Sequence, residues 1–207
     1  MMFKIKNLEF KNNEKTIFSI NERCIESGHH LLLLGESGCG KTTLMNILAG
    51  LLKPSSGEVS LEGRDYSKCS ESDMDRLRSE NFGFVFQRLH LIGHLSVEQN
   101  IILAQKTSDF PRVADIIADL GLKGKEKQKA RDLSVGEAQR VAIARAVANN
   151  PKVIFADEPT SALDDSNTEK VMNILFEQAE KTGATIIAAT HDARIKDSFN
   201  TILEMAA

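Results

Sequence analysis

The chain has 207 residues, with 26 Lys and Arg against 29 Asp and Glu, and a formal net charge of −3. This length suits one domain, or a core that carries a subdomain, and it suffices for a hydrophobic core without disulfides or structural metal. The nearly balanced charge argues against a broad basic surface for nucleic acid. The 3 cysteines are few and odd in number, which is typical of a reducing compartment. The N-terminus has no apolar stretch of signal-peptide length, and no apolar run approaches the ~20 residues of a membrane span. We therefore expect a cytoplasmic chain without a membrane span.

The hydrophobic pattern predicts strands that alternate with helices. Strands are predicted near 3–10 and at 16–20, 30–34, 58–61, 153–155 and 185–189. Helices are predicted from Lys41 to about Leu51 and at about 166–181, and residues 96–149 contain helix-like segments without a convincing strand. Strands separated by helices imply βαβ crossovers and a mainly parallel sheet. The sequence therefore predicts an α/β fold with an inserted helical subdomain at about 88–149.

A glycine-rich turn, GESGCGKT, follows the buried strand at 30–34 and opens the first helix. It fits the P-loop pattern G-x-x-x-x-G-K-[ST] in the structural context that the pattern requires. The glycines let backbone N–H groups surround phosphates, while Lys41 can reach the β- and γ-phosphates and the Thr42 hydroxyl can ligate Mg²⁺. We therefore predict that nucleotide contacts are made by Gly35, Glu36, Ser37, Gly38, Cys39, Gly40, Lys41, Thr42 and Thr43. Cys39 is interpreted as a small buried filler, with a reactive thiol as the alternative.

Two carboxylates end the apolar strand VIFAD, at Asp157 and Glu158. Ligands gather at the carboxyl ends of strands in an open parallel sheet. Asp157 can hold Mg²⁺ through water there, and Glu158 is placed to polarise a water for in-line attack on the γ-phosphate. Together with the P-loop, the pair predicts hydrolysis of a nucleoside triphosphate.

The segment LSVGEAQR at 133–140 precedes a helix with an apolar face. Ser134 and Glu137 match a capping box, and Ser134 with the Gly136 backbone can present a second anion site. Here the sequence resembles the ATP-binding-cassette (ABC) ATPases, whose signature reads LSGGQ. The resemblance continues through QRVAIARAVANNP and VIFADEPTSALD into ATHD and covers nearly the whole chain.

The resemblance implies one ABC ATPase domain over residues 1–207. Its P-loop NTPase (RecA-like) core and small antiparallel β subdomain would occupy about 1–87 and 150–207, and its α-helical subdomain about 88–149. It also implies roles for three further residues. Gln87 is similar to the Q-loop glutamine that touches Mg²⁺ and attacking water, and His191 to the switch histidine that contacts the γ-phosphate. Asp164 ends the segment Ser161–Asp164, which resembles the D-loop that communicates between protomers.

An aromatic side chain about 25 residues before the P-loop usually stacks on adenine in this family. Phe10 stands at that spacing, Phe18 is the rival, and Phe10 as a core residue only is the remaining alternative. Base–aromatic stacking contributes ~1–3 kcal/mol.

The signature departs from the family pattern. Val135 replaces the first glycine, Glu137 replaces the glutamine, and Ala138 removes the side chain that often follows. A β-branched residue is poorly suited to a positive φ, so a need for such a φ at Val135 would weaken the contact across the dimer. The basic run from Lys123 to Arg131 is interpreted as a solvated surface segment, with contact to an acidic loop of a partner or to lipid headgroups as the alternative.

The resemblance also implies partners. ATP would join two copies in a head-to-tail homodimer, with Ser134, Gly136 and Glu137 of one copy closing over the nucleotide of the other. Because the chain has no membrane span, a separate integral-membrane permease would be needed, with the chain peripheral on the cytoplasmic face of the inner membrane. Because only 16 residues follow His191, we expect no C-terminal regulatory domain.

The segments NFGFVFQRLHL and EQNI are most similar to the lipoprotein-releasing, macrolide-efflux and cell-division-type branch. The family function is then ATP hydrolysis that powers export, lipoprotein release or transmission of force across the membrane. Two alternatives stay open. One is a cell-division-type ATPase that regulates a cell-wall hydrolase through a membrane partner, and the other is a soluble ABC ATPase without a transport role.

Overall fold

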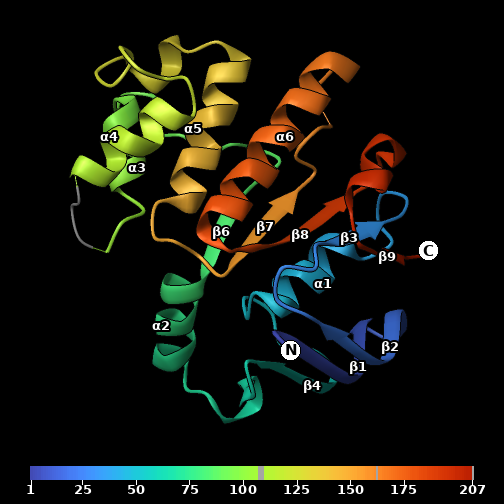
Figure 1. Ribbon diagram of the computed structural model, residues 1–207. Helices are drawn as coiled ribbons and strands as arrows, with labels where there is room; N and C mark the ends of the chain where they lie inside the picture. The colour runs from blue at the N-terminus through green and yellow to red at the C-terminus, as the bar shows by residue number, and fades with distance from the viewer. Residues whose placement is uncertain (107–109, 162, 207) are drawn as a thin grey trace. The chain divides into compact units, whose positions relative to one another are not determined.

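The computed structural model of the protein describes residues 1–106, 110–161 and 163–206 (Figure 1). These residues form two compact units, one of Met1–Arg78 with Thr185–Ala207 and the other of Ser79–Ala184. Ala162 of the expected D-loop and the terminal Ala207 lie outside the described residues. The subdomain boundaries near 88 and 149 stay a prediction.

The first unit contains an antiparallel sheet in the order β2-β1-β4-β5. Its strands are β1 (Phe3–Asn12), β2 (Lys15–Ile25), β4 (Ser56–Leu61) and β5 (Arg64–Asp65). Strand β4 begins at Ser56, two residues before the strand that the sequence predicts at 58–61. Gly57 makes this possible, because its φ is +90° and a Cβ there would lie 2.2 Å from the Asn7 carbonyl oxygen. The register of β1 against β4 shifts at this point, so the glycine allows a bulge rather than ending the strand.

Three parallel strands in the first unit lead to the P-loop. Strand β3 (Leu31–Leu34) lies between β8 (Thr185–Thr190) and β9 (Thr201–Glu204), and Leu31 pairs with Ile187 on one side and Thr201 on the other. Helix α1 (Lys41–Leu48) follows β3 and contacts β8. The helix ends before the expected Leu51 because Gly50 takes a left-handed φ of 66°.

The remaining elements of this unit are short or polar. They are the 3₁₀ turns η1 (Tyr66–Lys68) and η3 (Ala193–Ser198), and helix α2 (Glu71–Asn81), which extends to the start of the second unit. Only Met74 and Leu77 of α2 are buried, so the segment shows no apolar period. The sequence predicts neither α2 nor β9.

The second unit pairs two parallel strands with a group of helices (Figure 1). Strand β6 (Phe82–Val85) is parallel to β7 (Val153–Asp157). The helices are α3 (Val97–Ile102), α4 (Phe110–Asp119), α5 (Val135–Val147) and α6 (Asp165–Thr182), with the 3₁₀ turn η2 (Ala130–Asp132). Helix α5 is central, because it contacts α3, α4, α6 and β6. The predicted α/β class, with parallel strands, an antiparallel sheet and a helical region, is confirmed.

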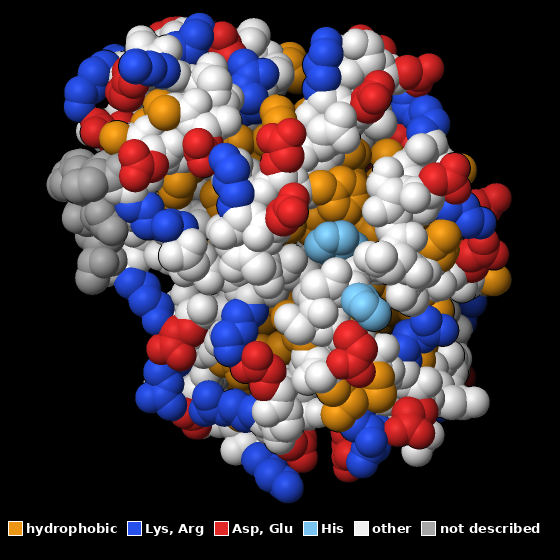
Figure 2. Space-filling view, viewed as in Figure 1, with side chains coloured by type: hydrophobic (Ala, Val, Ile, Leu, Met, Phe, Trp, Pro, Cys, Tyr) orange, Lys and Arg blue, Asp and Glu red, His pale blue; other side chains and the backbone are white. Residues whose placement is uncertain are grey.

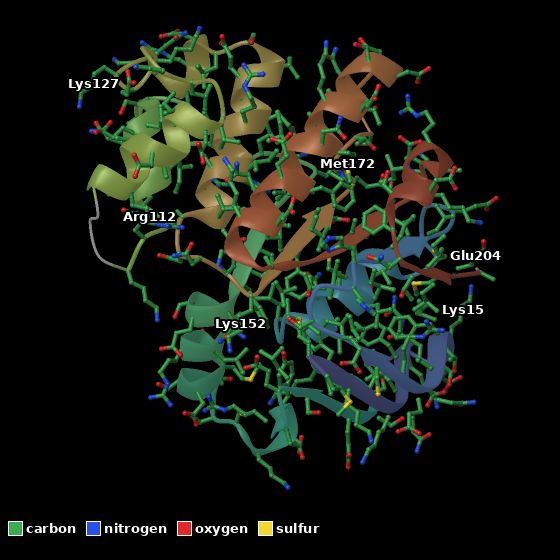
Figure 3. All side chains as sticks on the ribbon, viewed as in Figure 1. Lys15, Arg112, Lys127, Lys152, Met172 and Glu204 are labelled. Carbon is green, nitrogen blue, oxygen red and sulfur yellow. The ribbon has the colours of Figure 1, made fainter. Side chains whose placement is uncertain are left out.

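The C-terminal end of α5 is held by a side chain from α4. Arg112 donates hydrogen bonds to the carbonyl oxygens of Val147, at 3.1 Å, and Ala148, at 3.0 Å (Figure 3). Carbonyls in the last turn of a helix have no partner within the helix, so a cation at this position satisfies them. This bond fixes α4 to the helix that begins at the signature segment.

Charged side chains of both signs are interspersed on the face drawn in Figure 2. Among the described residues, no helix combines the length and apolar character needed to cross a bilayer.

We predict that Gly83→Ala will destabilise the second unit. A Cβ at Gly83 would lie 2.1 Å from the carbonyl oxygen of Ala146 in α5, so β6 and α5 would have to separate. Overpacking of this kind lowers the free energy of unfolding by about 1–3 kcal/mol, measurable by chemical denaturation. Gly93→Ala is the control, since its Cβ would meet Arg131 Cβ at an ordinary 3.5 Å. Equal unfolding midpoints for the two variants would contradict this packing.

Candidate functional site

The turn between β3 and α1 begins where the backbone leaves no room for a side chain. The Gly35 N–H donates to the carbonyl oxygen of Thr190, at the end of β8, over 3.3 Å. A Cβ on Gly35 would lie 2.3 Å from the carbonyl oxygen of Met205. Glycine at this position therefore lets the turn begin between two strand ends.

Two further glycines give the turn its left-handed backbone. Gly38 has a φ of +87° and Gly40 a φ of +99°, values that favour glycine. A Cβ on Gly40 would lie 2.9 Å from Ile17 Cγ2 and from Phe18 Cδ1, whereas one on Gly38 would have no atom of its surroundings within 4 Å. Gly40 thus packs against β2, and the backbone at Gly38 faces open space that a phosphate could occupy.

Lys41 is folded back into this turn. Its side chain is buried at 6% exposure, and Nζ donates to the carbonyl oxygens of Gly35, at 2.7 Å, and Glu36, at 2.9 Å. The N-cap Gly40 supplies no side-chain acceptor to α1, and the first turn has no acidic residue. The amine and the amide groups at the start of α1 therefore form a cradle suited to an anion. Thr42 is exposed in the same helical turn, with its hydroxyl as a hard oxygen donor.

The two aromatic candidates for adenine stacking face each other across β1 and β2. Phe10 pairs with Phe18 in register, and their rings stack at a centroid distance of 6.1 Å. Phe18 is buried at 9% exposure against Gly40, whereas Phe10 is half-buried. This arrangement favours Phe10, since it retains exposed surface for a base.

His191 directly follows β8 and is exposed. Its neighbour Thr190 accepts the Gly35 N–H, so the histidine leaves β8 next to the start of the P-loop. The first unit therefore holds the P-loop, the aromatic pair and His191.

In the second unit, Gln87 and the acidic pair follow neighbouring parallel strands. Val85 of β6 pairs with Ala156 of β7, so both strands end at the same edge. Gln87 is exposed two residues beyond β6, while Asp157 and Glu158 are half-buried. The carboxylates and the amide oxygen are ligands that suit Mg²⁺.

The backbone at Glu158 is in a left-handed conformation that the sequence did not reveal. Its φ is 46°, and its carbonyl oxygen accepts hydrogen bonds from Ser161 N, at 3.3 Å, and Ser161 Oγ, at 3.2 Å. The next carbonyl, on Pro159, accepts from the buried amide of Gln139 in α5 at 3.3 Å. Strained backbone of this kind persists only where the surroundings hold it, and it concentrates at functional sites.

The signature segment begins α5 with the predicted capping box. Ser134 is the N-cap, its N–H donates to Glu137 Oε2 at 2.9 Å, and the Glu137 N–H donates to Ser134 Oγ at 3.4 Å. Val135 is the first helical residue and its side chain is 68% exposed. The φ of Val135 is not positive, so the backbone strain that such a φ would impose does not arise here, and the effect of Val135 on the contact across the dimer stays a prediction. Gly136 is also exposed, which leaves the first turn accessible.

The carboxylate of Glu137 is also held by Lys125. Lys125 Nζ lies 2.5 Å from Glu137 Oε1. Hydrogen bonds from Lys125 and then from the Ser134 N–H lower the pKa of Glu137 from 4.5 to about 2. The basic run is therefore more than a solvated segment, and the sequence analysis missed this pairing. The available signal was a lysine-rich loop preceding an acid where the family has an amide.

Asp164 caps α6 rather than projecting free of the fold. Its carboxylate accepts hydrogen bonds from Asn167 N at 2.8 Å and Asn167 Nδ2 at 3.0 Å. The second unit thus holds Gln87, the acidic pair, the signature and Asp164, whereas the nucleotide cradle belongs to the first unit.

We predict that Glu137 stays ionised in mildly acidic solution. Because the pKa of Glu137 is lower in the folded than in the unfolded chain, its ionised carboxylate stabilises the folded state. This stabilisation is complete above pH 4.5 and is lost as the pH falls toward 2. Carbon-13 NMR should show no titration of this carboxyl between about pH 6 and 4, the range in which an ordinary glutamate titrates. Lys125→Met should raise the midpoint, whereas Lys127→Met should not. An ordinary midpoint in the unmodified chain would contradict the ion pair.

Comparison with known sequences and structures agrees with this geometry. Residues 21–161 match the family described as ABC transporter. The macrolide export ATP-binding/permease protein MacB of Mannheimia succiniciproducens is 39% identical over 210 residues, which is 96% of this chain and 32% of that protein. The lipoprotein-releasing system ATP-binding protein LolD of Wigglesworthia glossinidia brevipalpis is 33% identical over 215 residues, covering 99% of this chain and 94% of that protein. The chain thus spans about a third of the length of the macrolide export relatives.

Solved structures show the same fold. The dimeric cassette MJ0796, described as a bacterial ABC transporter cassette, superposes with a TM-score of 0.85 at 32% identity, over 99% of this chain and 94% of that one. The same cassette has been solved as a dimer in a post-hydrolysis state with ADP and Pi. These relatives and structures agree with the predicted P-loop NTPase (RecA-like) fold and with the resemblance to the lipoprotein-releasing and macrolide-efflux branch. The chain belongs to the ABC transporter family.

Proposed function

We propose that this chain is the ATP-binding and ATP-hydrolysing subunit of an ABC transporter. The observation that carries the proposal is the P-loop cradle, in which Lys41 is buried against the Gly35 and Glu36 carbonyls at the open N-terminus of α1. An amine beside the amide groups of a helix N-terminus suits the phosphates of a nucleotide. Phe10, half-buried beside β2, supplies a stacking face for adenine.

The chemistry requires a base, a charge-stabilising group and a metal site. Glu158 is the proposed general base, because its half-buried carboxylate follows β7 in a fixed turn. His191 and Lys41 are proposed to contact the γ-phosphate. Thr42, Gln87 and Asp157 offer the hard oxygen donors that suit Mg²⁺, which when bound neutralises charge on the transferred phosphoryl group.

We propose a head-to-tail dimer that forms when ATP binds. The MJ0796 cassette, similar over 99% of this chain, is dimeric in its solved structures. In this chain the exposed Ser134 and Gly136 at the start of α5 would meet the nucleotide of a second copy, with Glu137 in the same turn. Asp164, at the start of α6, would lie in the loop that communicates between copies.

The proposed partner is an integral-membrane permease. The macrolide export relatives are named ATP-binding/permease proteins and the chain covers about a third of their length. The LolD relative is named an ATP-binding protein and is covered almost completely. We therefore propose that this chain powers a separate permease from the cytoplasmic face of the inner membrane, in export, lipoprotein release or force transmission.

We predict that Lys41→Ala will weaken ATP binding by about 10- to 100-fold, because hydrogen bonds to a charged group contribute about 1.5–3 kcal/mol. Isothermal titration calorimetry with Mg-ATP measures the dissociation constant. Lys53→Ala is the matched control, because Lys53 is an exposed lysine shortly after α1. Unchanged affinity in the Lys41 variant would remove Lys41 from the nucleotide site.

We predict that Glu158→Gln will trap an ATP-bound dimer. The amide keeps the side-chain shape but cannot accept the proton of the attacking water, so bound ATP persists. Sedimentation velocity with saturating Mg-ATP should show the dimer, and Mg-ADP should leave a monomer. Glu177→Gln, an exchange in the middle of α6, is the control and should not trap the dimer. A Glu158→Gln chain that stays monomeric with Mg-ATP would contradict the proposed mechanism.

A further inference from the structure

The signature of this chain carries a negative charge in its first helical turn. Glu137 is the third helical residue after the N-cap Ser134, and its carboxylate accepts the Ser134 N–H at 2.9 Å. The same turn contains the exposed Gly136. A carboxylate at this position favours the helix but opposes the approach of a polyanion.

Lys125 compensates this charge from the loop before α5. Its Nζ lies 2.5 Å from Glu137 Oε1, and the exposures of the two side chains are 36% for Lys125 and 16% for Glu137. One carboxylate oxygen thus faces Lys125 and the other faces the Ser134 N–H. The lysine therefore both neutralises the carboxylate and limits its orientation.

We propose that Lys125 is a positioning residue for the ATP-driven dimer, which holds and neutralises Glu137 so that the first turn of α5 can approach the triphosphate bound to a second copy. The inference rests on the proposed function, because it requires that the signature meet ATP across the dimer. Without Lys125, the negative charge of Glu137 is not neutralised and repels the approaching phosphates. A symmetric dimer has two such sites, one at each nucleotide, so this repulsion weakens the dimer twice.

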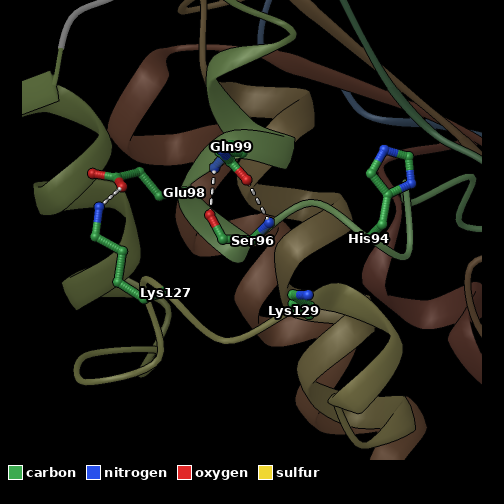
Figure 4. A pocket seen from close by; sticks show the side chains of 6 residues that line it. All are labelled: His94, Ser96, Glu98, Gln99, Lys127 and Lys129. Atoms are coloured by element: carbon green, nitrogen blue, oxygen red, sulfur yellow. Dashed lines mark hydrogen bonds and ion pairs between the residues drawn. The ribbon is translucent and has the colours of Figure 1, made fainter.

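A neighbouring pair in the same loop provides a matched control. Lys127 Nζ lies 2.5 Å from Glu98 Oε2, beside the first turn of α3 (Figure 4). Figure 4 shows this pair near the capping box of Ser96 and Gln99. Lys127→Met therefore removes one lysine and one ion pair without touching the signature.

A purely structural role of Lys125 predicts a different result. Lys125 is 36% exposed, and ion pairs in contact with solvent contribute only modestly to folding, so Lys125→Met should lower the thermal unfolding midpoint of the nucleotide-free chain only slightly. If Lys125 acts electrostatically, Glu137→Gln should cancel the effect of Lys125→Met on the dimer, because it removes the charge that Lys125 neutralises. The effect of Lys125→Met should also become smaller as salt rises, because the Debye length falls to about 3 Å at 1 M salt.

The test measures the dimer dissociation constant with saturating Mg-ATP by analytical ultracentrifugation, in the Glu158→Gln background. Lys125→Met should raise this constant about tenfold at low salt, from an electrostatic effect of about 0.7 kcal/mol at each of two sites. Adding Glu137→Gln should return the dissociation constant to within about twofold of the parent value. The difference between Lys125→Met and the parent should become smaller at high salt. Lys125→Arg and Lys127→Met should behave like the parent.

The outcomes separate the inference from the proposed function. If the parent dimerises with Mg-ATP but Lys125→Met does not weaken the dimer, or Glu137→Gln fails to restore it, the role of Lys125 is overturned. If the parent itself does not dimerise, the proposed function fails and the inference falls with it. A lower unfolding midpoint in Lys125→Met that Glu137→Gln does not correct would assign the lysine to folding alone.

Discussion

The site depends on a steric constraint at the passage from β3 to α1. The backbone must turn between the ends of β8 and β9 without a Cβ at Gly35, and must pack on β2 without one at Gly40. The same path buries Lys41 and places Gly40, which has no side chain, at the N-cap of α1. The glycine-rich turn before α1 therefore explains two properties. It lets the backbone pack closely against the neighbouring strands, and it gives the N-terminus of α1 its affinity for anions.

The second unit arranges its chemistry around α5. This helix begins directly after its N-cap Ser134 and packs on β6. Its Gln139 side chain donates to the carbonyl oxygen of Pro159, the residue after the proposed base Glu158. A movement of the N-terminal part of α5 would therefore be transmitted through Gln139 to the turn after β7. Such a link would connect the proposed contact across the dimer to the proposed base.

The sequence predicted those parts of the fold and site that depend on local pattern. The P-loop, the apolar strand before Asp157 and the capping box at Ser134 each have a fixed spacing with a physical reason, and the structure contains all three. Helix α2 could not be predicted because its surface is polar almost all round. Strand β9 has 4 residues like β3 but none of them is buried, so it lacks the apolar run that predicted β3. The Lys125 pair and the left-handed Glu158 depend on contacts between segments distant in sequence or on backbone angle. The residue roles assigned by resemblance, including Asp164 and His191, stay predictions.

The central claim is that ATP in the P-loop cradle of one copy meets the signature turn of another. The most direct measurement is a structure of the Glu158→Gln chain with Mg-ATP. We expect a symmetric dimer in which the triphosphate lies against Lys41 of one copy and Ser134 of the second. ATP contacted by the cradle alone, with Ser134 remote from any nucleotide, would contradict it.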